Sequence, residues 1–194
     1  QQITELAQRH DPQAITWRFD PICFFRRSNR ATLHQHLDAL EPIADALAAV
    51  GIRRCVTSFV DLYPKLRKRL RGTDLALVDP PLDIKVETLT AMAAALRKRQ
   101  IVLHLCCEQA ILDALPVDIG IRSGACIPGP LLAALFGGGF AMKKDPGQRR
   151  TQGCTCNIAA DIGSYRQQPC FHDCLFCYAN PQAPSRRPLN RKRS

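Results

Sequence analysis

Hydrophobic positions along the chain alternate between short β-rich runs and longer stretches with helical spacing. Each run that favours a strand is followed by a stretch that favours a helix, an order that gives parallel strands with right-handed crossovers. The predicted strands cover residues 14–18, 54–60, 101–106 and 117–121. The predicted helices cover residues 1–8, 32–50, 84–99, 108–115 and 129–135, with a basic helix ending near 71. We therefore predict an α/β fold, a partial (βα) barrel of about four parallel βα units.

Prolines and glycines divide this pattern. Pro42 falls inside the helical stretch 32–50 and is expected to kink or split it, and Gly51 ends it. We predict a partial barrel over residues 1–139, an irregular cysteine-rich cluster-binding segment over 140–180, and a disordered basic tail over 181–194. The chain opens without an initiator Met, inside a predicted helix, so we expect a missing N-terminal half of a larger barrel.

Polar and sulfur-bearing residues recur where the predicted strands end. In α/β barrels the chemistry lies at the carboxyl ends of the strands. Arg18, Asp20, Asp61 and Glu108 are therefore candidate catalytic residues that bind substrate or cofactor. An internal Arg–Asp salt bridge explains the same residues equally well, because a charged group at a barrel mouth must be paired or solvated.

The chain contains ten cysteines and has no apolar N-terminal region typical of a signal peptide. This combination favours free thiols and metal sites over disulfides. Cys170, Cys174 and Cys177 form a CxxxCxxC run. A [4Fe–4S] cluster is normally held by four thiolates, so three leave one iron open for chemistry. The alternative is a structural zinc site, although such sites close all four positions.

A second group of cysteines lies outside this run. Cys154 and Cys156 form a CxC pair that needs partners, and Cys106 and Cys126 follow neighbouring predicted strands. Together they could hold a second, closed [4Fe–4S] cluster. The alternatives are that the CxC pair is a redox pair, or that the other two are buried thiols. The remaining cysteines are interpreted as packing residues: Cys23, Cys55 and Cys107.

The cysteine run resembles the radical S-adenosylmethionine superfamily, and the string C-x-H-x-C-x-x-C-Y-A-N is similar to its photolyase-like branch, the relatives of spore photoproduct lyase. Further motifs resemble an uncharacterised bacterial domain-of-unknown-function family that ends in this cysteine cluster. These motifs are Trp17-Arg18-Phe19-Asp20-Pro21-Ile22, Ser58-Phe59-Val60-Asp61, Cys106-Cys107-Glu108, Gly124-Ala125-Cys126-Ile127, Lys144-Asp145, Gln148-Arg149, and Asp161-Ile162-Gly163 with Tyr165.

The resemblance implies a specific chemistry. A [4Fe–4S] cluster on Cys170, Cys174 and Cys177 would bind S-adenosylmethionine and cleave it reductively to a 5′-deoxyadenosyl radical. It also implies an electron donor of the flavodoxin or ferredoxin type and cofactor contacts from Phe176, Tyr178 and Asn180. Most members of the superfamily place the cysteine loop after the first strand, whereas here it comes last. The barrel is therefore permuted, or the loop folds back over the strand ends.

The net charge of +10, from 27 Lys and Arg against 17 Asp and Glu, favours contact with a polyanion. Nucleic acid is accordingly a candidate substrate or partner, although solvated helix ends explain the charge equally well. The alternative function is a non-catalytic, metal-stapled module that binds nucleic acid. We expect a cytoplasmic protein without membrane contact. The basic residues cluster at 65–71, 97–99 and 186–193.

Overall fold

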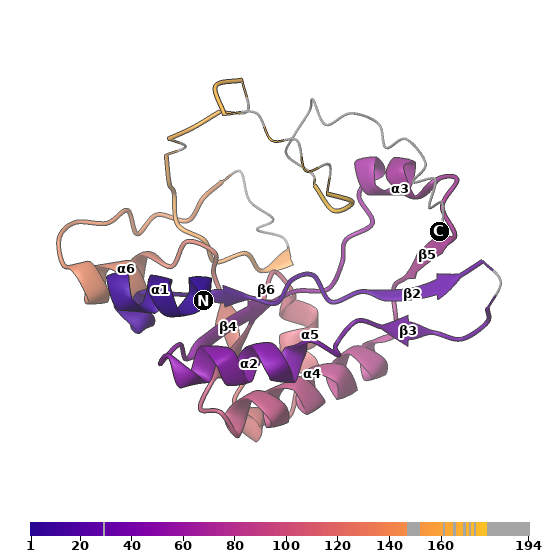
Figure 1. Ribbon diagram of the computed structural model, residues 1–194, viewed down its shortest axis with the longest axis horizontal. Coiled ribbons are helices and arrows are strands. Elements are labelled where there is room, and N and C mark those ends of the chain that lie inside the picture. The colour runs from indigo at the N-terminus through magenta and orange to yellow at the C-terminus, as the bar shows by residue number, and fades with distance from the viewer. Residues whose placement is uncertain are drawn as a thin grey trace.

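A parallel four-stranded sheet forms the centre of the computed structural model (Figure 1). Its strands are β1 (Trp17–Arg18), β4 (Arg54–Thr57), β6 (Val102–Cys106) and β7 (Arg122–Gly124), in the order β1-β4-β6-β7. The chain is therefore a mixed α/β protein with parallel strands in chain order. The structure describes residues 1–28, 30–146, 152–160, 162–164, 166–168, 170, 172 and 174–177.

One face of this sheet packs against helices and forms the main hydrophobic core. Cys55, Leu103 and Leu105 point to this face and are buried with side chains of α2 (Leu40–Ala49) and α4 (Leu82–Arg97). Figure 1 shows both helices side by side on that face. The interpretation of Cys55 as a packing residue agrees with this position, and burial raises its pKa to about 12.

The opposite face of the sheet carries a different set of side chains. Side chains alternate between the two faces along a strand, and residues paired across a parallel ladder share a face. Arg18, Val56, His104 and Arg122 form one row across the four strands. Cys106 lies two residues beyond His104, and Arg54 lies two residues before Val56, so both belong to the same face. We call it the thiol face.

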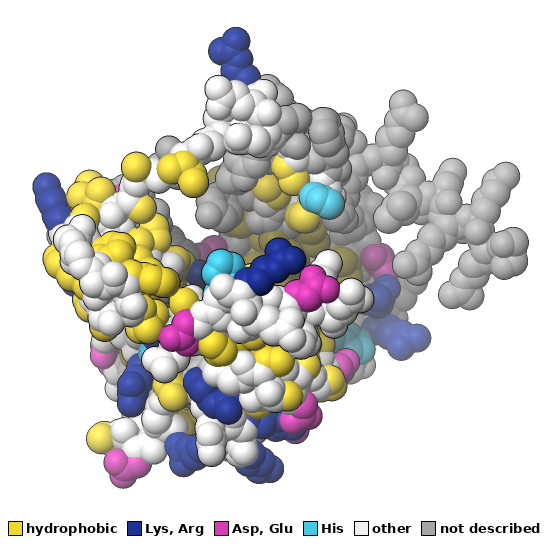
Figure 2. Space-filling model, turned by 60° about the vertical axis from the view of Figure 1, so that its left-hand side comes forward, with side chains coloured by type: hydrophobic (Ala, Val, Ile, Leu, Met, Phe, Trp, Pro, Cys, Tyr) yellow, Lys and Arg dark blue, Asp and Glu magenta, His cyan; other side chains and the backbone are white. Residues whose placement is uncertain are grey.

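The smaller elements surround this sheet. Figure 2 shows hydrophobic side chains gathered at one side of the visible face, with charged side chains spread over the rest. Among the described residues no helix is long and apolar enough to span a bilayer. The smaller elements around the parallel sheet are α1 (Gln2–Arg9), η1 (Pro12–Ala14), α3 (Pro64–Leu70), α5 (Gln109–Ala114), η2 (Val117–Ile119) and α6 (Gly129–Phe136).

A second, antiparallel sheet was not predicted. It consists of β3 (His34–Gln35), β2 (Phe24–Arg27) and β5 (Leu75–Val78), in that order. These strands are two to four residues long, and their pairing joins segments about 50 positions apart, as in Phe24 with Val78. Such short runs carry too little periodicity to be recognised locally.

Two predicted elements are wrong in position. The helix predicted over 32–50 begins only at Leu40, which places Pro42 in its first turn. Proline is tolerated there because the first N–H groups of a helix have no intrahelical partner, so it neither kinks nor splits the helix. The strand predicted over 117–121 is the 3-10 turn η2, and the strand itself is β7. Gly120 ends the turn in a left-handed conformation, with φ of 78°.

Candidate functional site

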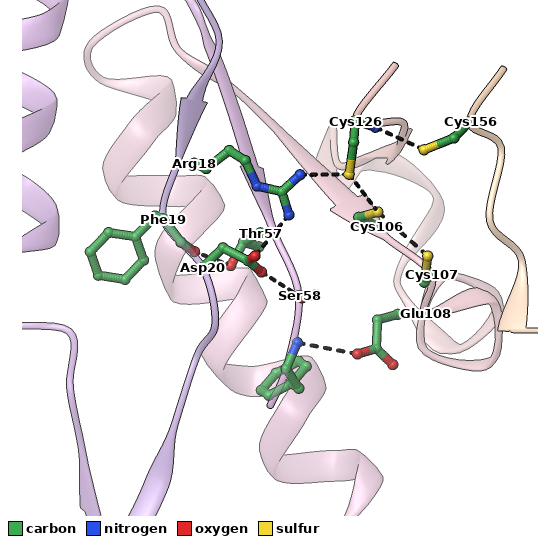
Figure 3. A network of polar contacts seen from close by, with 11 residues as sticks. Arg18, Phe19, Asp20, Thr57, Ser58, Cys106, Cys107, Glu108, Cys126 and Cys156 are labelled. Carbon is green, nitrogen blue, oxygen red and sulfur yellow. Dashed lines mark hydrogen bonds and ion pairs between the residues drawn. The ribbon is translucent and has the colours of Figure 1, made fainter. Parts of the chain in front are cut away.

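Arg18 lies between a carboxylate and a thiol at the carboxyl end of β1 (Figure 3). Its Nη2 atom is 2.7 Å from Oδ2 of Asp20, and its Nη1 atom is 2.6 Å from Sγ of Cys126. The Ser58 hydroxyl donates to the other oxygen of Asp20 at 2.5 Å. Although burial opposes the charge of Arg18, its bonds to Asp20 and Cys126 raise its pKa overall. The predicted Arg–Asp salt bridge is therefore present, and it also reaches a thiol.

Glu108 follows the end of β6 and points toward the segment after β4. Its Oε1 atom accepts a hydrogen bond of 3.1 Å from the backbone N–H of Phe59. Burial raises the pKa of Glu108 more than this hydrogen bond and the charge of Lys85 lower it. Asp61, the fourth predicted catalytic residue, is exposed in the segment between β4 and α3. The strand ends thus bring Arg18, Asp20 and Glu108 to one side of the sheet.

Five thiols converge on the thiol face from three separate parts of the chain. The Cys106 sulfur lies 3.5 Å from that of Cys107 and 3.8 Å from that of Cys126. Cys154 and Cys156 are buried in the same cluster as Cys106 and Cys107. The backbone N–H of Cys126 donates to Sγ of Cys156 at 3.1 Å. The structure therefore brings together all four cysteines of the predicted second group. We call the five residues the thiol cluster.

Cys107 is the member that sequence reasoning missed. It was interpreted as a packing residue, and it is indeed buried, but its sulfur belongs to the thiol cluster. Its backbone has φ of 58°, a left-handed conformation that few residues other than glycine adopt. In this conformation the chain turns directly after β6, so that adjacent cysteines both present their sulfurs to the cluster. Two consecutive cysteines at a predicted strand end were the available signal.

The thiols of the cluster differ in acidity. The pKa of Cys126 falls to about 5, because the Cys106 thiol donates a hydrogen bond to it and Arg18 pairs with its charge. The same interaction with Cys126 raises the pKa of Cys106, and burial raises it further. Burial raises the pKa of Cys107 to about 12. The cluster therefore combines one exposed thiolate with buried thiols.

The distances between the sulfurs of the thiol cluster can be compared with those that metal centres require. With metal–sulfur bonds of about 2.3 Å, the sulfurs of a tetrahedral site lie about 3.8 Å apart. The sulfur–sulfur distances of 3.5 Å from Cys106 to Cys107 and 3.8 Å from Cys106 to Cys126 are close to this value. A cubane spreads its thiolates over four irons and therefore needs wider spacing. The sulfur contacts run from one cysteine to the next and do not surround a common centre. Within the part of the chain that the structure describes, no three or more His, Cys, Asp or Glu side chains are arranged as a metal-binding group.

The end of the CxxxCxxC run, residues 174–177, docks on α3, the helix that follows the carboxyl end of β4. One guanidinium nitrogen of Arg69 donates to the carbonyl oxygens of Cys174 and Cys177, each at 2.7 Å. The Tyr63 hydroxyl donates to the Phe176 carbonyl, and the Cys177 N–H donates to the Cys174 carbonyl at 3.0 Å. The last turn of the run is therefore held through its backbone, with Cys174 exposed and Cys177 half-buried. Tyr178 and Asn180, the other predicted cofactor contacts, lie outside the described residues.

Comparison with models of known protein families gives a match that covers most of the chain. The model of the family described as "Domain of unknown function (DUF1848)" matches residues 1–179. No curated protein and no solved structure matches the chain.

Proposed function

We propose that this chain, which belongs to the DUF1848 family over residues 1–179, is an iron–sulfur enzyme of the radical S-adenosylmethionine type. The description of the family names no function, so we infer the function from the residues of the site. The observation that supports this proposal most directly is the docking of the CxxxCxxC turn on α3 through Arg69. These contacts are made by the backbone carbonyls of Cys174 and Cys177, and they fix the backbone that carries the two cysteines. With Cys170 they would hold three irons of a [4Fe–4S] cluster.

The bound cluster would supply an electron to S-adenosylmethionine and so generate a radical that abstracts hydrogen from a substrate. The chain's own residues would bind the substrate and exclude water. Arg18 and Asp20 form a fixed charge pair at the carboxyl edge, and the Ser58 hydroxyl orients the carboxylate. Glu108, whose pKa burial raises, is suited to hold or accept a proton beside the substrate.

We further propose that the parallel sheet is part of an open (βα) barrel. Its strands follow one another in chain order, and α2 and α4 cover only one face. The other face carries arginines, His104 and Cys106, as expected for the interior of a barrel with a polar site. The docking on α3 supports the arrangement in which the cysteine loop folds back over the strand ends.

The thiol cluster is proposed as a second metal centre. Cys106, Cys126, Cys154 and Cys156 supply the four thiolates that a closed [4Fe–4S] cluster requires. The spacing of 3.8 Å between Cys106 and Cys126 instead favours a single thiophilic ion, for which Cys107 offers a further ligand. Counting iron, sulfide and zinc in the same preparation decides between the two.

Anaerobic reconstitution of the protein tests the proposal. We expect the reduced protein to give a [4Fe–4S] EPR signal that changes when S-adenosylmethionine is added, and Cys174→Ala to lose it. Cys126→Ala is the matched control, because it removes a thiol from the second centre and should keep the response. A protein that takes up zinc alone, or a cubane signal that S-adenosylmethionine leaves unchanged, would overturn the radical mechanism.

A further inference from the structure

We propose that Arg54 and Arg122, on the thiol face of the sheet, form a binding site for a dianionic phosphate group. Neither residue belongs to the sites described above. The inference extends the proposed function by giving the substrate or an effector a chemical class. It does not depend on a metal cluster, since the arginines are part of the parallel sheet.

The two arginines flank His104 on neighbouring strands. His104 pairs directly with Arg122 of β7 in the parallel ladder, and Arg54 of β4 pairs with Val102, two residues before His104. All three side chains therefore point to the thiol face. Arg54 reaches the His104 ring at 2.9 Å, and Arg122 is the direct ladder neighbour of His104. The site is thus built on β-strands, where its geometry is fixed by backbone pairing.

His104 holds Arg54 in place. Nη1 of Arg54 lies 2.9 Å from Nε2 of His104, and Nδ1 of His104 lies 3.2 Å from the Ser123 carbonyl oxygen. A guanidinium only donates and a carbonyl only accepts, so the hydrogen of the ring is on Nδ1 and Nε2 is the acceptor. His104 is therefore neutral here. A neutral histidine orients the guanidinium without cancelling its charge.

Arg54 and Arg122 form no ion pair with any residue that the structure describes. Among the described residues, every ion pair involves other cations, and neither Arg54 nor Arg122 contacts a carboxylate. Arg18 and Arg99 differ in this respect, since each is bonded to at least one carboxylate. The Nε atom of Arg54 is buried and has no hydrogen-bond partner. A buried donor without an acceptor is costly, which points to a ligand that supplies one.

Arg54 and Arg122 carry two positive charges that no carboxylate of the described residues neutralises, and this number indicates the class of ligand. Burial and the nearby charge of Arg122 both lower the pKa of Arg54, so an anion between them would relieve an unfavourable interaction. Two guanidiniums match a phosphate group, which carries a charge of about −1.5 to −2 near neutral pH and offers three acceptor oxygens. Guanidinium forks bind phosphate in a bidentate manner. A carboxylate would neutralise only one of the two charges.

Calorimetric titration in a phosphate-free buffer tests this site. The ligands are inorganic phosphate, a nucleoside 5′-monophosphate and acetate. We expect both phosphates to bind the wild-type protein and acetate to bind more weakly. Arg122→Gln should weaken phosphate binding by about tenfold or more, as expected for loss of a charge-assisted contact. If the mononucleotide binds more tightly than inorganic phosphate, the site recognises the phosphate of a larger molecule. If the two bind equally tightly, the site recognises inorganic phosphate itself.

Arg26→Gln is the matched control, since it removes the same charge from an exposed position on β2 in the other sheet. Arg122 is exposed, so its variant should fold even if Arg54→Gln does not. The proposal is overturned if phosphate does not bind the wild-type protein, if acetate binds as tightly as phosphate, or if Arg122→Gln and Arg26→Gln bind phosphate equally well.

Discussion

At the scale of single residues, Arg18 and Arg54 show how the same side chain serves two purposes on one sheet face. Arg18 is hydrogen-bonded to Asp20 and Cys126, so its charge is paired within the protein. Among the described residues, the side chain of Arg54 hydrogen-bonds only to the neutral ring of His104, which does not neutralise its charge. The difference arises from neighbours on other strands and not from the local sequence.

The acidity of Cys126 predicts its reactivity. A thiolate, not a thiol, is the nucleophile, and the pKa of Cys126 is lowered to about 5. In metal-free protein at mildly acidic pH, we expect iodoacetamide to modify Cys126 faster than the buried thiols of the cluster. Mass spectrometry of digested protein measures each rate. Arg18→Gln should slow the modification of Cys126, whereas equal rates in both proteins would contradict the role given to Arg18.

The burial of His104 predicts a pH-dependent stability. Burial and the charges of Arg54 and Arg122 lower its pKa to about 4, despite its bond to the Ser123 carbonyl. An unfolded histidine binds a proton below about pH 6.5, so the unfolded state gains protons first as the pH falls. The unfolding free energy should therefore drop between about pH 6.5 and 4, on the order of 1 kcal/mol. Urea unfolding measures it, and a His104→Gln variant with the same pH slope would contradict the assignment.

At the scale of elements, the ends of strands and the helix α3 position the chemistry. The left-handed turn at Cys107 lets β6 present two adjacent sulfurs and then Glu108. Three backbone carbonyls near the end of the described chain converge on Arg69, namely those of Cys174, Leu175 and Cys177. A single side chain of α3 thus holds the turn of the proposed cluster loop.

Removing this side chain should release the turn. We expect Arg69→Gln to increase amide hydrogen exchange at Cys177, whose N–H bonds to the Cys174 carbonyl, by about tenfold. The variant should also reduce the iron retained after reconstitution. Lys68→Gln, an exposed neighbour on the same helix, is the control and should change neither value. Unchanged exchange in Arg69→Gln would show that the turn does not depend on α3.

At the scale of the whole molecule, the net charge of +10 makes contact with a polyanion favourable. This charge is the main observation that supports the alternative function, a metal-stapled module that binds nucleic acid. Part of it lies on α3, whose last turn is basic and partly exposed. Among the described residues, Arg69 is the member of this group that bonds to the cysteine turn.

The polyanion hypothesis predicts a steep dependence on salt. If α3 contacts phosphates, duplex DNA binding should weaken by at least about tenfold between 50 and 200 mM salt. Lys68→Gln combined with Arg71→Gln should reduce the slope of log affinity against log salt by about 2. Fluorescence anisotropy of labelled DNA measures both. An affinity that does not change with salt would assign the basic residues to solvated surface alone.

Local patterns in the sequence determined much of the framework. The helix α4 and the strands β4 and β6 lie where periodic apolar residues predicted them, because burial of one face imposes that spacing. The convergence of Cys106 and Cys126 was also predictable, since parallel strands end at a common edge, and the CxC pair of Cys154 and Cys156 was expected to join them because it needs partners.

Only the tertiary structure decided which side chains meet across long distances in the chain. The antiparallel sheet β3-β2-β5 depends on the pairing of β2 with a strand about 50 residues away, and no local periodicity encodes that partner. The bond between Arg18 and Cys126, 108 positions apart, and the contacts of Arg69 with the cysteine turn are likewise products of packing. Sequence determines which groups are available and with what period they recur. Folding alone sets their distances, and those distances determine which thiol ionises and which arginine remains uncompensated.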